Sequence, residues 1–559
     1  MDPREHELAT AGSRRPVGAF YTPAWAVHRL LDLTLEPLLA SAAAEGPEGL
    51  RRVRVLDPAC GTGAFLDVVA RRIERALCAV GVDPQEAAVH ARTRSVMGVD
   101  IDSVALLRCR EQLSVPGRTD EPSVLHGDAL LMWHPMPPWS PAPEPPRDGP
   151  AWADVVGPSG FAPEGFDLVV GNPPFLGQLR RLTARRSRLG VEVRRRLAAV
   201  AGPYTDSAAL FVLLGLGLLG PGGVLCLVQP QSFLAARDAA PVRAEATRVA
   251  DLTHLWAPRT RVFDAAVDVC APVLRRRRDE GVDHDPAQVK IVIDVGPGVA
   301  PRCREVRFDA DALTWSVLLA AASDHPALDL ASNGVLGDVA AVEADFRDRY
   351  YAIRGHVVDE EFSDGGPRLM TVGLIDPARS LWGRRPARVH RRAWQHPRVL
   401  RSGLDESTAR WVDARLVPKV LVATQTRVIE ALVDEEGGLL PSVPVLSVLP
   451  ARTGDLYRIA AVLGAPPVSL WAMRHYGGTA LSHDALKLSA SALRRVPLPG
   501  DERRWSVGAE AIREAHSAED SRVRDRAVRR SARAMCEAYG LDPDGEVYRW
   551  WEARMPRRP

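Results

Sequence analysis

The chain has 559 residues, of which 46% are hydrophobic and 25% charged, and its formal net charge is only +2. These values are typical of a globular protein of about two to four domains and exclude a highly basic or acidic disordered chain. The seven cysteines form no CxxC pair and no charged segment precedes an apolar N-terminal stretch, so we expect reduced thiols, a cytoplasmic protein and no signal peptide.

The first 300 residues alternate between short apolar runs and helical segments. The predicted strands are 52–57, 96–101, 123–130, 166–172, 223–229, 251–256 and 269–274, and helices are predicted up to residue 80 and at 103–113, 206–219 and 239–249. This alternation predicts a doubly wound, parallel α/β sheet, which binds ligands at the carboxyl ends of its strands. The proline-rich residues 134–164 are predicted to be an exposed loop.

One stretch is apolar enough to suggest a membrane span. Residues 208–228 carry no charge over 21 positions, which is long enough to cross a bilayer. The glycine-proline turn at 220–223 divides the stretch, however, and a helix followed by a short buried strand explains it better. We therefore expect no membrane association.

The second half of the chain lacks this regular alternation. Short β-like and helical runs mix between residues 330 and 500, and residues 501–559 balance 13 basic against 12 acidic side chains. We predict an α/β domain over 1–300, a mixed α/β domain over 330–500 and a helical, solvated tail over 501–559.

Positive charge is concentrated in two segments. Residues 176–200 hold eight arginines against one acid, and residues 380–427 hold ten arginines and a lysine against three acids, which gives +7 and +8. The whole chain uses arginine in preference to lysine, since only three of its 72 basic residues are lysines. This preference explains why the basic residues of the two segments are arginines. It does not explain the lack of acids, which is typical of a site for a polyanion.

The loop DPACGTGAF (57–65) connects the first predicted strand to the first helix. Gly61 and Gly63 would allow a ligand to approach the backbone closely. The dinucleotide fingerprint GxGxxG would require glycine where Leu66 stands, and Asp57 is unfavourable beside a phosphate. A cofactor with a cationic, amine-bearing end, such as S-adenosylmethionine, suits this loop better.

Polar residues also follow the next three predicted strands. Asp100 ends the second strand, Asp128 follows the third, and NPPF (172–175) follows the fourth. Asp100 could bind both ribose hydroxyls of such a cofactor, and Asp128 could accept from its adenine amino group. Each acid alone could instead cap the following helix, but the complete set at successive strand ends indicates one shared site.

These motifs resemble the N6-adenine DNA methyltransferases whose cofactor motifs precede the catalytic motif and whose target recognition domain is C-terminal. The matching stretches are GAFYTP (18–23), VLDPACGTGAFL (55–66), GVDID (98–102), GDAL (127–130), FDLVVGNPPF (166–175), PGGVLCLVQPQSFL (221–234) and RVFDAAVDV (261–269). The resemblance implies a seven-stranded, Rossmann-like domain that uses S-adenosylmethionine and a mixed α/β recognition domain that binds double-stranded DNA.

The resemblance also assigns roles to single residues. The implied cofactor-binding residues are Thr22, Pro23, Asp57, Ala59, Cys60, Gly61, Gly63, Asp100, Ile101, Asp128, Ala129 and Asn172. The implied catalytic residues are Asn172, Pro173, Pro174 and Phe175, where the family usually has tyrosine in place of Phe175. Phe175 and Phe263 would stack on the target base, and Cys60 is interpreted as packing in the loop and not as a nucleophile.

The Asn-Pro-Pro-aromatic sequence suits methyl transfer to an exocyclic amine, whose lone pair is delocalised into the ring. The side-chain oxygen of Asn172 and the carbonyl of Pro173 could accept both N–H bonds and favour a tetrahedral nitrogen, while the prolines keep that carbonyl rigid. The base must leave the duplex to reach the site. An aromatic partner then contributes roughly 1–3 kcal/mol of stacking.

Arginines in both basic segments are the predicted DNA contacts, to phosphates beside the flipped base and to guanine edges. They are Arg180, Arg181, Arg185, Arg186, Arg384, Arg385, Arg391 and Arg392. No metal site is expected, because no acid lies two residues before any lysine, as a (D/E)xK nuclease motif requires. We predict methylation without cleavage, in a system where a restriction or phage-defence partner could supply the nuclease.

Two alternatives to a site-specific DNA adenine-N6 methyltransferase stay open. An RNA or protein N-methyltransferase could use a similar loop. A non-cleaving DNA-binding subunit of a defence complex could carry a vestigial or partner-dependent site, although the intact Asp57, Asp100, Asp128 and Asn172 argue against decay. The motifs leave the recognition sequence and the oligomeric state open.

Overall fold

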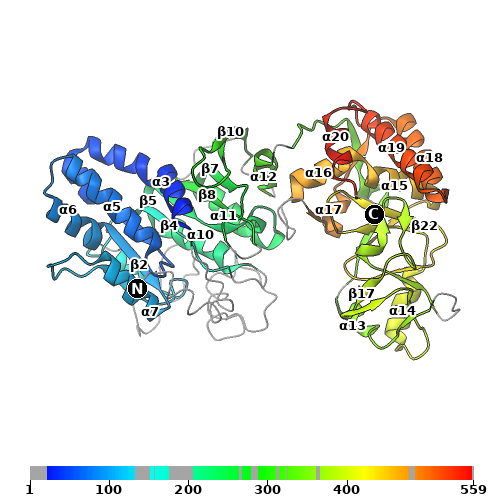
Figure 1. Ribbon diagram of the computed structural model, residues 1–559, viewed down its shortest axis with the longest axis horizontal. Helices are drawn as coiled ribbons and strands as arrows, with labels where there is room; N and C mark the ends of the chain where they lie inside the picture. Colours follow the sequence, from blue (N-terminus) through cyan, green and yellow to red (C-terminus); the bar gives the residue numbers. More distant parts are fainter. Residues whose placement is uncertain are drawn as a thin grey trace. The chain divides into compact units, whose positions relative to one another are not determined.

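The structure is a computed structural model, and it describes two compact units that meet in sequence between residues 322 and 323. The described residues are 22–132, 151–156, 158–175, 200, 205–263, 267–278, 288–309, 314–323, 325–345, 347–360, 366–477 and 485–556. The first unit spans residues 1–322 and the second spans residues 323–559 (Figure 1). The domains predicted from sequence covered residues 1–300 and 330–500.

A single sheet forms the centre of the first unit. Its strands are β1 (Val55–Asp57), β2 (Val96–Asp100), β3 (Ser123–His126), β4 (Phe166–Gly171), β5 (Leu219–Leu227), β6 (Gln229–Pro230), β7 (Ala250–Pro258), β8 (Val269–Arg276), β9 (Gln288–Asp294) and β10 (Arg302–Arg307). Their order is β10-β9-β7-β8-β5-β4-β1-β2-β3, with β6 paired to β8. β1 to β5 run parallel, whereas β8 runs antiparallel to both β5 and β7.

The sheet is larger than the seven-stranded one predicted. All seven predicted strands are present as β1 to β5, β7 and β8, and the mostly parallel α/β class is confirmed. The described residues give ten strands because β6 continues the path beyond β5 and pairs with β8, while β9 adds to β7 in parallel and β10 adds to β9 antiparallel.

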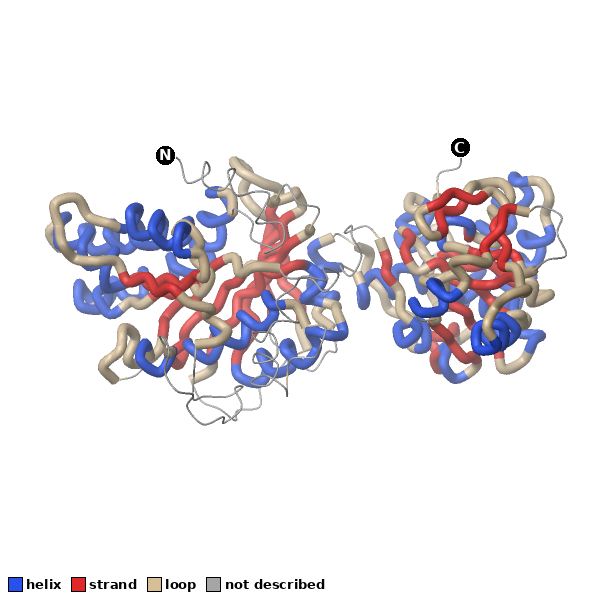
Figure 2. The backbone as a smooth tube through the Cα atoms, turned by 90° about the horizontal axis from the view of Figure 1, so that it is seen from below, coloured by secondary structure: helices blue, strands red, loops and turns tan. Residues whose placement is uncertain are grey.

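Helices cover both faces of this sheet (Figure 2). They are α3 (Ala24–Ala44), α4 (Gly46–Arg52), α5 (Ala64–Ala79), α6 (Pro84–His90), α7 (Ser103–Leu113), α8 (Trp152–Val155), α10 (Ser207–Leu218), α11 (Ala240–Val249) and α12 (Ser316–Ala322). Val55 packs into the core beneath α3, α5 and α7, and its neighbour Leu56 packs into the core beneath α10, α11 and α12. Strands buried on both faces need continuous apolar sequence, which explains why the predicted strands show no polar alternation.

The apolar stretch at 208–228 divides as predicted, into helix α10 and strand β5. Within the described ranges, no single helix is long and apolar enough to span a membrane. A bent pair in the second unit, Thr453–Gly464 with Pro466–Tyr476, reaches that length and composition only together. Both of its helices bury most of their apolar residues in the core of that unit.

The prediction of an exposed loop over 134–164 is wrong for residues 151–156, whereas residues 158–164 form turns and bends with four exposed positions. Residues 152–155 form the short helix α8, and Trp152 is fully buried. Its indole N–H donates to the carbonyl of Ala129 at 2.9 Å. The buried ring and this hydrogen bond attach the segment to the end of β3, which proline content alone did not reveal.

The second unit holds two four-stranded sheets, in the orders β12-β24-β20-β22 and β13-β19-β14-β23, and several two-stranded pairs. Its strands are β11 (Ser332–Val335), β12 (Ala340–Ala344), β13 (Val357–Asp359), β14 (Arg368–Met370), β15 (Ile375–Asp376), β16 (Arg379–Ser380), β17 (Ala387–Val389), β18 (Arg392–Trp394), β19 (Pro397–Val399), β20 (Lys419–Ala423), β21 (Gln425–Thr426), β22 (Glu430–Asp434), β23 (Leu439–Pro441), β24 (Leu446–Pro450), β25 (Leu486–Lys487) and β26 (Pro497–Pro499). Its helices are α13 (Arg347–Ala352), α14 (Glu406–Arg415), α15 (Leu456–Gly464), α16 (Pro466–Tyr476), α17 (Ala490–Arg494), α18 (Glu502–Ser517), α19 (Ser521–Ala538) and α20 (Glu546–Glu552).

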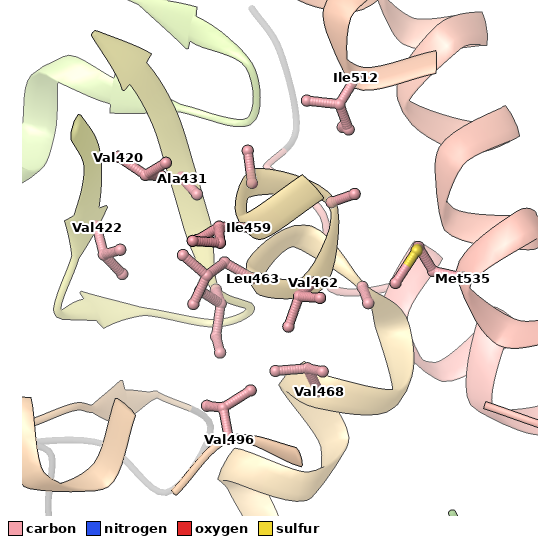
Figure 3. Close-up of a cluster of buried hydrophobic side chains, with 14 of the residues drawn as sticks. Val420, Val422, Ala431, Ile459, Val462, Leu463, Val468, Val496, Ile512 and Met535 are labelled. Atoms are coloured by element: carbon pink, nitrogen blue, oxygen red, sulfur yellow. The ribbon is translucent and has the colours of Figure 1, made fainter. Parts of the chain in front are cut away.

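The core of the second unit joins the first of these sheets to the helices (Figure 3). Val420 and Val422 of β20 pack with Ile459 and Leu463 of α15, and the same cluster includes Met535 of α19. Residues 501–559 therefore contribute buried side chains to this core through α18, α19 and α20.

Candidate active site

The four strand ends that carry the predicted site residues meet at one edge of the sheet. β1, β2, β3 and β4 are parallel neighbours, with Asp57 paired to Gly98 and Asp100 paired to His126. The residues that follow β3 and β4 begin at Gly127 and Asn172. The structure thus brings Asp57, Asp100, Asp128 and the NPPF loop to a common edge, where open α/β sheets bind ligands.

The side chain of Asp100 is hydrogen-bonded to the glycine loop (57–65). The backbone N–H of Gly61 donates to Asp100 Oδ2 at 2.8 Å, and that of Asp102 donates to Asp100 Oδ1 at 2.9 Å. Gly61 has a φ of +52°, and a Cβ added there would have no neighbour within 4 Å. A Cβ on Gly63, where φ is +93°, would lie 2.8 Å from Cys109 Sγ. Gly63 therefore serves packing, whereas Gly61 borders open space that a ligand could enter.

Asp57 is almost completely buried, with 2% of its surface exposed. Its Oδ1 accepts from the backbone N–H of Ala59 at 3.1 Å. A Cβ added to Gly171 would lie only 2.4 Å from that same oxygen. Burial raises the pKa of Asp57 to about 8, and the nearby charge of Asp100 adds to the effect. Because residue 171 is glycine, the strand end before the NPPF loop can lie close to Asp57 at the start of the glycine loop.

Asp128 lies in a turn after β3. Its Oδ1 accepts from the backbone N–H of Leu130 at 3.0 Å, a bond within the turn at 129–131 and not at the start of a helix. Burial raises the pKa of Asp128, as it does for Asp100. Nearby, Ala129 is buried, while the apolar side chain of Ile101 is 57% exposed. An exposed isoleucine at this edge is available to pack against a flat ligand.

The NPPF loop is fixed by contacts that the sequence analysis missed. The N–H of Val228, after β5, donates to the carbonyl of Gly171 at 3.0 Å. The hydroxyl of Ser207, in the first turn of α10, donates to the carbonyl of Pro174 at 2.7 Å. The fully buried Gln229 donates to the carbonyl of Ala208 at 3.0 Å. The sequence signals for these partners are Asp206, a helix-capping residue directly before Ser207, and the matching stretch 221–234, which contains Val228 and Gln229.

Phe175 and Phe263 lie against each other. Their ring centroids are 6.4 Å apart and the planes meet at 68°, an edge-to-face arrangement. Phe263 is 5% exposed, and Phe175 is partly buried against the same core. The structure therefore brings the two predicted stacking residues together. Their rings meet edge to face, so there is no gap between two parallel ring faces.

Cys60 packs inside the loop. It is 6% exposed, and its sulfur would lie 2.7 Å from a Cβ added to Gly98. A hydrogen bond with Cys109 and burial raise the pKa of the Cys60 thiol well above its usual range. A protonated, buried thiol is a poor nucleophile.

Thr22 and Pro23 precede α3, and Thr22 is buried. Helix α3 is anchored to the sheet through Asp294 at the end of β9. Arg29 of α3 donates to Asp294 Oδ2 at 2.8 Å, and the indole N–H of Trp256 donates to the same oxygen at 3.0 Å. This fully buried carboxylate holds the start of α3 on the sheet, a role that the sequence did not indicate.

The predicted DNA-binding arginines fall into two sets. Arg180, Arg181, Arg185 and Arg186 lie outside the described residues. Arg384, Arg385, Arg391 and Arg392 are exposed on the second unit.

The comparisons with known proteins agree with this fold. Residues 78–257 match the Eco57I restriction-modification methylase family. A comparison with curated proteins finds no match. The chain therefore resembles restriction-modification methyltransferases, which confirms the resemblance inferred from its motifs.

Among solved structures, the chain is similar to the type IIL restriction-modification enzyme MmeI in complex with DNA, with a TM-score of 0.61, 13% identity and coverage of 97% of this chain and 80% of that one. It is also similar to a nuclease-deletion mutant of the type ISP restriction-modification enzyme LlaGI in complex with a DNA substrate mimic, with a TM-score of 0.51 and 13% identity. That match covers 92% of this chain and 48% of LlaGI, so this chain spans about half of that enzyme. At these identities the likeness shows the fold.

Proposed function

We propose that the chain is a site-specific DNA adenine-N6 methyltransferase of a restriction-modification or phage-defence system, with S-adenosylmethionine as its cofactor. The observation that carries this proposal is the contact between Gly171 and Asp57, which joins the NPPF loop directly to the glycine loop. A methyl donor held at one loop would then face an amine held at the other. The match of residues 78–257 to a restriction-modification methylase family supports the choice of DNA as substrate.

The residues at the sheet edge fit S-adenosylmethionine, which supplies an electrophilic sulfonium methyl group when it is bound. The open space at Gly61 allows close approach to the backbone, and the buried carboxyl of Asp57 suits an amino group. Asp100 already accepts two backbone N–H groups, but a carboxylate offers about four lone-pair sites and can also accept from ribose hydroxyls. Ile101 and Asp128 would hold the adenine ring and its amino group.

The target amine would be held by Asn172 and by the carbonyl of Pro173. Two acceptors on its two N–H bonds direct the nitrogen lone pair toward the methyl group, and preorganised acceptors need no rearrangement during the reaction. Ser207 and Val228 fix the loop on either side of these acceptors through the carbonyls of Pro174 and Gly171. The loop is therefore rigid because two other elements hold it, and not only because it contains prolines.

A flipped base would stack on Phe175 and Phe263 after separating them. Their edge-to-face contact is worth about 0.5–1.5 kcal/mol, whereas stacking on a base contributes roughly 1–3 kcal/mol. The exchange favours base entry. Phenylalanine in place of the family's tyrosine retains this stacking and loses only a hydroxyl.

The proposal is tested by incubating the purified chain with methyl-labelled S-adenosylmethionine and, separately, duplex DNA, RNA and a mixture of proteins. We expect label in duplex DNA and N6-methyladenine among its digested nucleosides. Label only in RNA or protein would favour the alternative N-methyltransferase. DNA binding without transfer to any of the three would favour a non-enzymatic subunit, and N4-methylcytosine would overturn the choice of adenine.

The raised pKa of Asp57 predicts proton release on cofactor binding. With a pKa of about 8, Asp57 is mostly protonated at pH 7 in the free protein. A cationic amino group favours the ionised carboxyl, so binding should release most of one proton at pH 7, where the amino group of the ligand still carries its charge. Affinity should accordingly rise as pH increases toward about 8, and fall at higher pH because an α-amino group loses its own proton at about pH 8.

Calorimetric titration of S-adenosylhomocysteine in buffers of different ionisation enthalpy measures this proton release. The Asp128→Asn variant is the control, because Asp128 is a partly buried carboxyl at the same sheet edge but would face a neutral amino group. It should bind more weakly and still release the proton. A heat independent of buffer for the wild-type protein at pH 7 would contradict the role given to Asp57.

A further inference from the structure

The arginines of residues 380–427 have different surroundings in the second unit. Four are engaged within the unit: Arg398 donates to the carbonyls of Glu360 and Gly366, Arg401 pairs with Asp413, Arg410 with Glu406, and Arg415 with Glu343 and Asp345. Arg398 also lies over the ring of Trp382 at 5.0 Å. Arg398 and Arg415 connect separate segments of the unit, whereas the exposed ion pairs of Arg401 and Arg410 add little stability and mainly neutralise their charge.

Five other arginines of the same segment differ from these. They lie between residues 384 and 392, are all exposed, and form no ion pair with any part of the chain that the structure describes: Arg384, Arg385, Arg388, Arg391 and Arg392. Arg385 lies near the carboxyl of Glu430 without forming an ion pair, and burial raises the pKa of that carboxyl to about 8. Five unpaired cations so close together repel one another, and a polyanion would relieve that repulsion.

Most of these arginines lie on the hairpin of β17 and β18, which Figure 1 shows beside α13. Ala387, Val389 and Trp394 point inward and are buried in the core around the second four-stranded sheet. Arg388 and Ala393 are paired across the hairpin and both are exposed. One face of the hairpin is thus fixed to the unit, and the other presents an arginine beside a small residue.

The tip of the hairpin has an uncommon backbone conformation. His390 and Arg391 have φ values of 51° and 68°, in the left-handed region that favours glycine. The backbone N–H of His390 donates to the hydroxyl of Tyr350 at 2.7 Å, and their rings lie 4.1 Å apart. Arg392 lies over the ring of Trp394 at 4.4 Å. Such a conformation persists only where the surroundings hold it, and it occurs often at functional sites.

From these features we infer that the hairpin β17–β18 enters the major groove of duplex DNA, with Arg391 at its tip reading a guanine edge. Arg384, Arg385, Arg388 and Arg392 contact the phosphates on either side. A two-stranded ribbon fits the width of the B-form major groove, and arginine bound to guanine O6 and N7 is the commonest specific contact there. This inference rests on the proposed function, because it takes duplex DNA as the substrate.

The geometry favours DNA over the other polyanions. A rigid hairpin with a two-residue tip is narrow enough for the B-form major groove, whereas the A-form major groove of double-stranded RNA is too deep and narrow for side chains to read. Tyr350 holds the backbone of the tip at His390, and Arg392 lies over Trp394, so little backbone freedom is lost when DNA binds.

The test uses the full chain and three variants. The first replaces Arg388, Arg391 and Arg392 with glutamine. The second is a matched control that makes the same change at Arg503, Arg522 and Arg526, which are exposed on α18 and α19 and form no ion pair with any described residue. The third is Arg391→Lys, which keeps the charge but cannot bind guanine through two parallel N–H groups.

Two measurements separate phosphate binding from base reading. The first is the affinity for a duplex DNA of mixed sequence as a function of salt concentration. The hairpin triple variant should bind at least tenfold more weakly at low salt, and its slope of log K against log salt should fall by about 0.9 for each phosphate that it no longer neutralises. The second is the sequence motif methylated in a library of genomic DNA. Arg391→Lys should accept other bases at one guanine position, where discrimination falls on the order of 10- to 100-fold, with the salt slope unchanged.

The outcomes distinguish this inference from the proposed function. If the wild-type chain neither binds nor methylates duplex DNA, the proposed function fails. If the wild-type chain methylates DNA and the hairpin triple variant has the same salt slope as the α18–α19 control, the hairpin inference is overturned while the function stands. An unchanged motif in Arg391→Lys would overturn the base-reading role of the tip. Equal affinity for double-stranded RNA and DNA would overturn the major-groove assignment.

Discussion

Replacing Asn172 with alanine should reduce methyl transfer by at least about a thousandfold while binding of duplex DNA persists. Removing one preorganised hydrogen-bonding group at a reaction centre costs roughly 10²–10³ in rate, and here the same group also orients the amine toward the methyl donor. Gly171 and Pro174, on either side of this loop, are held through their carbonyls by Val228 and Ser207, so alanine leaves the backbone in place. The loss should appear in the rate constant for methyl transfer, measured under single-turnover conditions.

The chain offers a matched control for this variant. It has only two asparagines, and the other, Asn333, is exposed in β11 of the second unit. Asn333→Ala should methylate at the wild-type rate and unfold at the wild-type temperature. Transfer in Asn172→Ala within tenfold of wild type would refute the role of this side chain in holding the amine.

Sequence predicted the first unit well where a strand is buried on both faces and its end carries chemistry. Continuous apolar runs such as FDLVV identify β4, because a parallel strand has no solvent-facing side that would interrupt the run. Asp57, Asp100 and Asp128 could be placed at one edge from strand order alone. The same reasoning could not find β9 and β10, which follow the predicted strands and add to the sheet at β7.

The missed residues act through tertiary contacts between segments far apart in sequence. Ser207 lies in no motif, and Gln229 lies in the matching stretch 221–234 without an assigned role; their roles follow from the contacts that they make with residues 174 and 208. Asp294 is one acid among many in the chain until Arg29 and Trp256 are seen to share it. In the second unit, the number of arginines predicted a basic surface. Arg388 is exposed between two buried residues of β17, whereas β18 shows no such alternation. The exposure of the hairpin arginines and their lack of described ion pairs separate them from those engaged within the unit, and neither feature can be read from the sequence.

Replacing Gly171 with alanine should remove both cofactor binding and methyl transfer. The added Cβ would lie 2.4 Å from Asp57 Oδ1 and 2.8 Å from Asp57 Cγ, closer than atoms can approach. The carboxyl is buried and bonded to the N–H of Ala59, so it cannot turn into solvent. Overpacking of this kind costs about 1–3 kcal/mol. The displaced carboxyl would enter the space proposed for the cofactor, and we expect transfer to fall by more than about a hundredfold.

The Gly61→Ala variant tests whether the cofactor occupies the space beside the glycine loop, because it adds a methyl group there without the clash against Asp57 that Gly171→Ala causes. A Cβ on Gly61 meets no protein atom within 4 Å, so Gly61→Ala should keep its packing and lose cofactor affinity at least about tenfold because the Cβ occupies the ligand space. Its positive φ also costs roughly 1–2 kcal/mol for alanine. Gly46→Ala controls for that cost, since Gly46 has a φ of +76° and equally open surroundings. Gly46→Ala should lose the same stability and bind the cofactor as wild type does. If Gly61→Ala binds S-adenosylhomocysteine as tightly as Gly46→Ala, the cofactor does not lie over this loop, and the contact between Gly171 and Asp57 serves only to pack the sheet edge.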